Sequence, residues 1–92
     1  MTSRVRVTVD RVDQPHCGMK VGDSFDVDGS NLTMPTGSSF CIYAMAAVFP
    51  VLAMKMGELD PGDWLERKPY IACPDPTENV VMRLERVVEP AV

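Results

Sequence analysis

The sequence predicts an α+β domain in which a small, mostly antiparallel sheet packs on one central apolar helix. Two segments, residues 4–12 and 79–88, alternate apolar and polar side chains with period two, which is typical of strands with one solvent-facing side. Between them, residues 40–54 carry no charged side chain, which predicts a buried helix. Strands before and after one central helix favour the α+β class. We expect a single domain over residues 1–92, with its core at about 4–88.

The first half of the chain predicts two strands joined by turns. The strand at 4–12 should turn its three valines toward the core and its charged residues toward solvent. A second strand signal covers residues 19–27 and contains a turn at 20–23. The sequence Asp28-Gly29-Ser30-Asn31 is typical of a further turn.

The second half predicts a polar loop at 58–69, a short strand at 70–73 and a final strand at 79–88. The prolines that follow the short strand end it, because proline cannot donate a hydrogen bond to a sheet. In the final strand we expect one face to point inward, formed by Val80, Met82 and Leu84.

The helix is expected over residues 39–56. Ser38 or Ser39 is a suitable N-cap, and Gly57 is a natural residue to end the helix. Pro50 should kink or restart it, because proline lacks the N–H that the helix interior requires.

A helix that is apolar on every side must be covered on every side. One small sheet covers only one side, so we expect helix 39–56 to contact another copy of the chain or a partner subunit. The alternative is a monomer, in which the tyrosine hydroxyl and several alanines make an acceptable exposed face. These alanines are Ala44, Ala46, Ala47 and Ala53.

Charge and cysteine content narrow the class of protein. The net charge of -4 argues against nucleic-acid binding, which usually requires a basic surface. The uncharged stretch at 40–54 is shorter than the ~20 residues that cross a bilayer, so we expect no membrane span. Residues 1–10 lack the pattern of a secretory signal, and 3 widely spaced cysteines are not a disulfide framework. We therefore expect a soluble, cytoplasmic protein.

Each cysteine lies at the edge of an expected element. Cys17 follows the first strand and adjoins His16, the only histidine. Cys41 lies in the first turn of the helix, where the helix dipole and the unbonded N–H groups favour a thiolate. Cys73 ends the short strand, two residues before Asp75.

Three interpretations of these residues stay open. In the first, Cys17, Cys41 and Cys73 bind zinc or iron together with His16 or Asp75, although the paired C-x-x-C spacing of strong zinc motifs is missing. In the second, Cys41 is a nucleophile or redox thiol, His16 is its base, and Asp75 is an acid or an orienting carboxylate. In the third, the cysteines are small apolar core residues of an accessory protein.

The order of these motifs resembles a largely uncharacterised family of small bacterial and archaeal proteins with three cysteine motifs. The resemblance extends over residues 5–88 and rests on Cys17-Gly18, Val21-Gly22-Asp23, Cys41 at the helix start and Cys73-Pro74-Asp75-Pro76. It implies that the three cysteines belong to one system, and it implies no reaction. The family pattern has proline after the second cysteine, where this chain has Ile42, so the helix start is less defined here.

The leading hypothesis is a small binding or accessory protein. Its three cysteines, with His16 and Asp75, would converge on one end of the sheet and hold a metal or a small ligand. The alternatives are a cysteine-dependent small-molecule enzyme with Cys41 as its reactive thiol, and a structural subunit of a larger enzyme complex.

Overall fold

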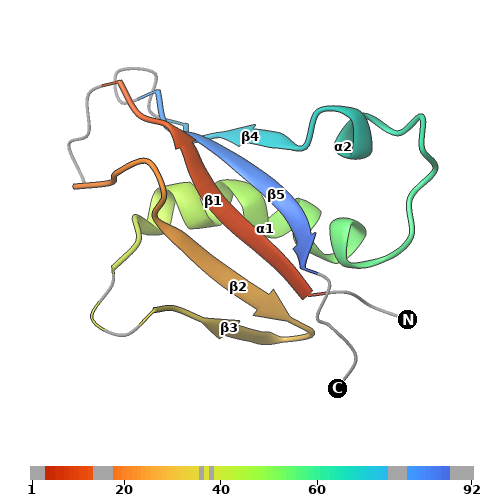
Figure 1. Cartoon of the computed structure of the whole chain (residues 1–92), viewed down its shortest axis with the longest axis horizontal. Coiled ribbons are helices and arrows are strands. Elements are labelled where there is room, and N and C mark those ends of the chain that lie inside the picture. The colour runs from red at the N-terminus through yellow and green to blue at the C-terminus, as the bar shows by residue number, and fades with distance from the viewer. Residues whose placement is uncertain (1–3, 14–17, 36, 38, 75–78, 88–92) are drawn as a thin grey trace.

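The computed structural model describes residues 4–13, 18–35, 37, 39–74 and 79–87. In these residues, five strands form one antiparallel sheet in the order β3-β2-β1-β5-β4, and α1 lies across one face of it (Figure 1). The elements are β1 (Arg4–Arg11), β2 (Ser24–Asp28), β3 (Asn31–Thr33), α1 (Ile42–Met56), α2 (Trp64–Arg67), β4 (Tyr70–Ala72) and β5 (Val81–Val87). The predicted α+β class, with a sheet packed on a central apolar helix, is confirmed.

The middle strand of the sheet is β1, which pairs with β2 on one side and with β5 on the other. Val7 lies opposite Phe25 in one pair and opposite Leu84 in the other, so three inward side chains meet at the centre. The first and last strands are therefore neighbours, although almost the whole chain separates them in sequence. This pairing brings the two ends of the described chain together.

The core lies between α1 and the inward face of the sheet. All six inward residues predicted for the first and last strands are buried, each at most 1% exposed, which confirms both assignments. Their partners on α1 are Ala44, Val48 and Leu52, which are spaced to share one helix face. Phe25 and Phe40 meet edge to face, with ring centroids 4.8 Å apart, at one side of this core.

Two short elements were not predicted, because neither has a hydrophobic period. The three residues of β3 are all exposed and are positioned by pairing with β2 through a turn at Gly29, whose φ is 61°. The loop expected at 58–69 contains α2, which begins where the Asp63 carboxylate accepts a hydrogen bond of 2.9 Å from the Leu65 N–H. A single capping side chain thus defines this helix.

The start of α1 corrects the sequence prediction of a helix from Ser39. The helix begins at Ile42, and Cys41 is its N-cap; Ser39 is not helical, and Ser38 lies outside the described residues. The N–H of Cys41 is directed at the sulfur of Met19, 3.4 Å away, and its backbone is extended, so the helix starts at the next residue, Ile42, three residues after the predicted start. Cys41 is therefore not inside the first turn.

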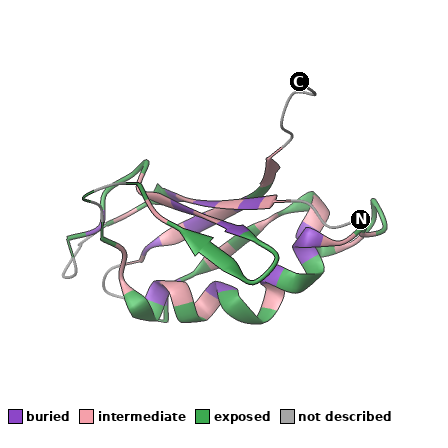
Figure 2. Cartoon of the chain, turned by 90° about the horizontal axis from the view of Figure 1, so that it is seen from below, coloured by how far each residue is buried: buried purple, intermediate pink, exposed green. Residues whose placement is uncertain are grey.

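The helix runs without a break through Pro50, which corrects the expected restart there. Pro50 is exposed, so the carbonyl that loses its partner can be solvated. The side of α1 turned away from the sheet is exposed along its length (Figure 2). In the described part of the chain, α1 and α2 are both too short, or too polar, to span a bilayer.

Candidate ligand site at the cysteine end of the sheet

Four elements meet at one end of the molecule, on the left in Figure 1: the end of β1, the start of β5, the end of β4 and the start of α1. The strand pairings agree, since Arg11 lies opposite Val81 and the Cys73 N–H donates to the Val80 carbonyl over 2.8 Å. We call this region the cysteine end and define it by Asp13, Met19, Cys41, Cys73 and Asn79. It contains both cysteines that the structure describes.

Cys41 is half-buried at the start of α1. Its carbonyl accepts the Met45 N–H over 3.0 Å, which is the first hydrogen bond of the helix. Within the described chain, its side chain makes no capping hydrogen bond, unlike that of Asp63 at α2. Cys41 is therefore next to a helix N-terminus whose first N–H groups lack helical acceptors.

Cys73 follows β4 and is 7% exposed. It belongs to the same hydrophobic cluster as Met19 and Val80, and Cys41 packs against that cluster. Buried cysteine often acts as a small apolar residue, so the packing of Cys73 alone is compatible with a purely structural role. Its position relative to Cys41 is what makes it a candidate ligand.

Asp13 and Asn79 join the described residues that flank the two segments carrying the remaining predicted site residues. The Asn79 amide donates to Asp13 over 2.7 Å, and Arg11 donates to both oxygens of the same carboxylate. The hydrogen bond from Arg11 is the main cause that lowers the pKa of Asp13, and the bond from Asn79 adds to it. Asn79 has a φ of 48°, a left-handed conformation that asparagine tolerates. The chain therefore leaves and re-enters the described structure at neighbouring points.

Three of the predicted site residues, His16, Cys17 and Asp75, lie outside the described residues. The structure thus brings Cys41 and Cys73 to the same end of the molecule and leaves the predicted convergence of all five residues untested. Among the residues that it describes, no group of three or more histidine, cysteine or acidic side chains is arranged to hold a metal.

The opposite end of α1 carries a charged cluster that the sequence analysis missed, formed by Lys55, Glu66 and Arg86. Lys55 is only 4% exposed and donates to the Leu65 carbonyl at 3.1 Å and to Glu66 at 3.3 Å. Arg86 forms an ion pair with Glu66 and donates to the Gly57 carbonyl at 2.9 Å. Hydrogen bonding from Arg86, and then from Lys55, lowers the pKa of Glu66.

This cluster fastens α1 to α2 and β5, which is a structural role. A signal for it exists in the sequence: Lys55 continues the inward spacing of Val48 and Leu52, so it had to be buried beside a carboxylate. Which carboxylate would pair with it depends on the tertiary fold.

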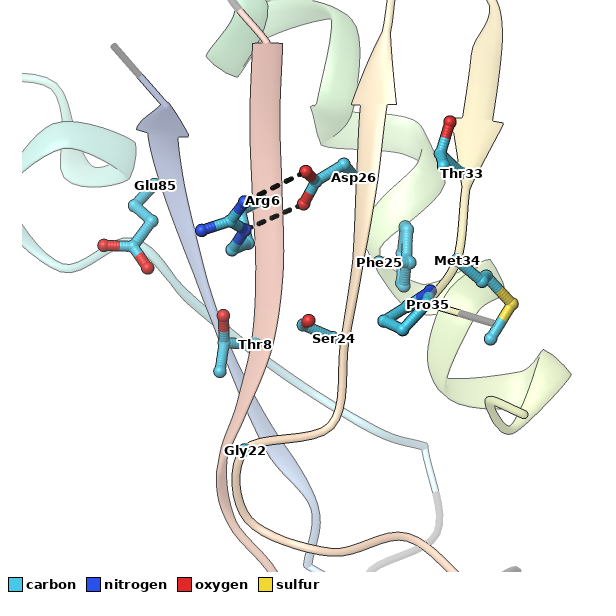
Figure 3. Close-up of a pocket in the computed structure, with 10 residues that line it drawn as sticks. All are labelled: Arg6, Thr8, Gly22, Ser24, Phe25, Asp26, Thr33, Met34, Pro35 and Glu85. Carbon is cyan, nitrogen blue, oxygen red and sulfur yellow. Dashed lines mark hydrogen bonds and ion pairs between the residues drawn. The ribbon is translucent and has the colours of Figure 1, made fainter. Parts of the chain in front are cut away.

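A pocket of about 540 Å³ opens on the face of the sheet that α1 leaves uncovered (Figure 3). Arg6 lines it and donates two hydrogen bonds to Asp26, 2.9 and 3.1 Å long, which raise the pKa of Arg6. The hydroxyl groups of Thr8 and Ser24 lie nearby (Figure 3). Because Asp26 already pairs with the Arg6 guanidinium, that side chain is not free to bind a charged ligand in this pocket.

A comparison with models of known families found no match to this chain, and comparisons with curated proteins and with solved structures found none either.

Proposed function

We propose that the cysteine end binds a thiophilic metal ion, zinc or iron, through Cys17, Cys41 and Cys73, with His16 or Asp75 as a further ligand. The main observation in support is that Cys41 and Cys73 lie at the same end of the sheet. The described residues that flank the segments holding His16, Cys17 and Asp75 lie at that end as well. Thiolate and imidazole groups are the ligands that these metals prefer.

The connectivity of the chain supports this convergence. Cys17 is two residues before Met19, so their Cα atoms can be at most about 7 Å apart. The sulfur of Met19 in turn lies 3.4 Å from the backbone nitrogen of Cys41. Asp75 follows Pro74 directly after Cys73. All five residues are thus within chain reach of one small region.

The residues would contribute in different ways. Cys41 would contribute its sulfur from the start of α1. The apolar cluster around Cys73 would keep water away from the bound ion. Because each thiol must lose its proton to bind, affinity should rise with pH.

The proposal includes a cytoplasmic location, where a reducing environment keeps the cysteines as thiols. It also includes the resemblance to the small bacterial and archaeal family, in which three cysteine motifs belong to one system. A role as an accessory or structural subunit that carries such a site is compatible with both.

The test is metal binding by the purified, reduced protein, with Zn²⁺ and Fe²⁺ as separate probes. We expect one ion per chain, and we expect Cys17→Ser, Cys41→Ser and Cys73→Ser each to weaken binding by at least about tenfold. Asp75→Asn tests the fourth ligand, and Asp28→Asn, a change of the same kind at an exposed residue at the far end of β2, is the matched control. Absence of bound metal, with no loss of stability in any cysteine variant, would contradict the proposal.

A second candidate is a cysteine-dependent enzyme acting on a small molecule, with Cys41 as its nucleophile, His16 as the base and Asp75 as the orienting acid. The favouring observation is that Cys41 is half-buried at an N-cap and makes no capping hydrogen bond in the described chain. Alkylation at neutral pH discriminates the two. The enzyme requires Cys41 to react much faster than a thiol in a short peptide, and this rate should fall in His16→Gln.

A further inference from the structure

The side of α1 that faces away from the sheet is an uncharged stripe. We call it the outer stripe; its exposed residues are Ile42, Tyr43, Ala46, Phe49, Pro50, Ala53 and Met54. Ile42 and Tyr43 are each 68% exposed, Phe49 is 49% exposed, and Met54 is 45% exposed. Exposed helix faces in soluble domains normally carry charged residues. This face has none over its whole length, which points to a partner.

The large residues of the outer stripe supply roughly half of the apolar area that a dimer interface needs. A large apolar side chain offers roughly 150–250 Å², so the four large residues of the outer stripe together expose on the order of 400–500 Å². The alanines and Pro50 add to this area. A specific interface buries about 800 Å² on each partner, so the outer stripe and its immediate surroundings suffice for a small one.

We propose that the outer stripe is the interface with a second copy of this chain, in which the two α1 helices pack antiparallel across a two-fold axis. The sizes of the residues fit this arrangement. With the axis near the middle of the helix, Tyr43 of one copy lies over Ala53 of the other, and Ala46 lies over Pro50. Tyr43 thus meets a small residue, Ile42 of one copy lies over Met54 of the other at the rim, and the small central residues allow the helices to approach closely.

A groove beside the outer stripe gives the large side chains a place to enter. It has a volume of about 270 Å³ and lies between α1 and the β2–β3 hairpin. Its lining is mostly apolar and includes Leu32, Phe49 and Ala53. Because Ala53 borders this groove, Tyr43 of the second copy would reach it in the antiparallel arrangement.

A second copy fits this surface better than an unrelated protein does. The outer stripe has no charge that could select a partner or fix its orientation. A two-fold contact between identical chains does not need charges for this purpose, because the same surface patch of each copy contacts the other. Because the outer stripe carries no charged residue, contact through it also leaves the charged side chains of both copies, each with a net charge of -4, outside the interface.

The experiment is sedimentation equilibrium of the full chain from about 1 to 500 μM. A chelator and a reductant exclude bridging by metal or disulfide, which also separates this test from that of the metal site. We expect a mass of twice 10.1 kDa at the higher concentrations. Ala46→Glu, at the centre of the outer stripe, should give the single-chain mass while retaining its far-UV circular dichroism.

The controls keep the proposal falsifiable. Val21 is 67% exposed and lies outside the outer stripe, so Val21→Glu should leave the dimer intact. If Ala46→Glu fails to fold, Ile42→Glu replaces it, since an acidic residue is favourable at the first position of a helix. A wild-type protein at the single-chain mass throughout, a mass above two chains, or dimers that persist in the folded variant would each overturn the proposal.

Discussion

The two ends of α1 are held in opposite ways. At its carboxyl end, Lys55 and Arg86 share the Glu66 carboxylate, and Arg86 also binds the last turn through Gly57. At its amino end, Cys41 caps the helix without a side-chain capping hydrogen bond among the described residues, and its N–H is directed at the Met19 sulfur. One end is thus fixed by paired charges, and the other is packed with polarisable sulfur atoms.

The contrast shows that the charged groups at the carboxyl end already bind one another. In the charged cluster, the buried Lys55 ammonium donates hydrogen bonds to the Glu66 carboxylate and to the Leu65 carbonyl. The Glu66 carboxylate also pairs with Arg86, so it binds two cations. Breaking such pairs is costly, so the cluster is suited to stability. The amino end has no such ion-pair network among the described residues, and it is the end at which we propose that a ligand binds.

The largest expected effect is a difference in the free energy of unfolding between substitutions near the two ends of α1. Leu65 is fully buried beside the charged cluster, and its carbonyl accepts a hydrogen bond from the Lys55 ammonium. Leu65→Ala should lower the free energy of unfolding by about 2–5 kcal/mol, whereas Cys73→Ala removes one buried sulfur and should cost about 1 kcal/mol. Urea unfolding of the metal-free protein measures both. Equal losses would contradict the view that the carboxyl end of α1 is the fixed end.

A smaller effect should be seen in acid. The pKa of Glu66 in the folded protein lies below its ordinary value of 4.5, so its stabilising contribution is fully present above that pH. The contribution is lost as the pH falls through the lowered pKa. Glu66→Gln should therefore be less stable than wild type at pH 7, and the gap should narrow toward pH 3. Melting temperatures at several pH values test this, and a constant gap would count against it.

The smallest effect belongs to the cysteine end. The pKa of Asp13 is lowered below 3.8 mainly by Arg11, with Asn79 adding to it, and these groups are exposed. Asp13→Asn should therefore destabilise the protein at pH 7 less than Glu66→Gln does, again with a gap that narrows in acid. The same melting series measures it. A loss greater than that from Glu66→Gln would reverse the comparison of the two ends.

The strands and the central helix could be predicted because each has a local signal. The alternation in β1 and β5 and the uncharged run in α1 follow directly from burial. By contrast, β3 is specified by its pairing with β2, and the start of α1 by the contact between Cys41 and Met19. Such contacts join residues far apart in sequence and leave no local pattern.

The candidate site was predictable only in part, for the same reason. The positions of Cys41 and Cys73 at element edges could be read from the sequence, but their common end depends on the order of strands in the sheet. The charged cluster was missed because Lys55, Glu66 and Arg86 come from three different elements. His16, Cys17 and Asp75 lie outside the described residues, so their part in the site stays a prediction.

The most direct test of the central claim is X-ray absorption at the zinc edge of the zinc-loaded protein. Binding by Cys17, Cys41 and Cys73 predicts three sulfur atoms at about 2.3 Å from the metal and one lighter ligand at about 2.0–2.2 Å. Cys41→Ser and Cys73→Ser should each reduce the sulfur count by one. A first shell of nitrogen and oxygen alone, unchanged in the cysteine variants, would contradict a metal site at the cysteine end.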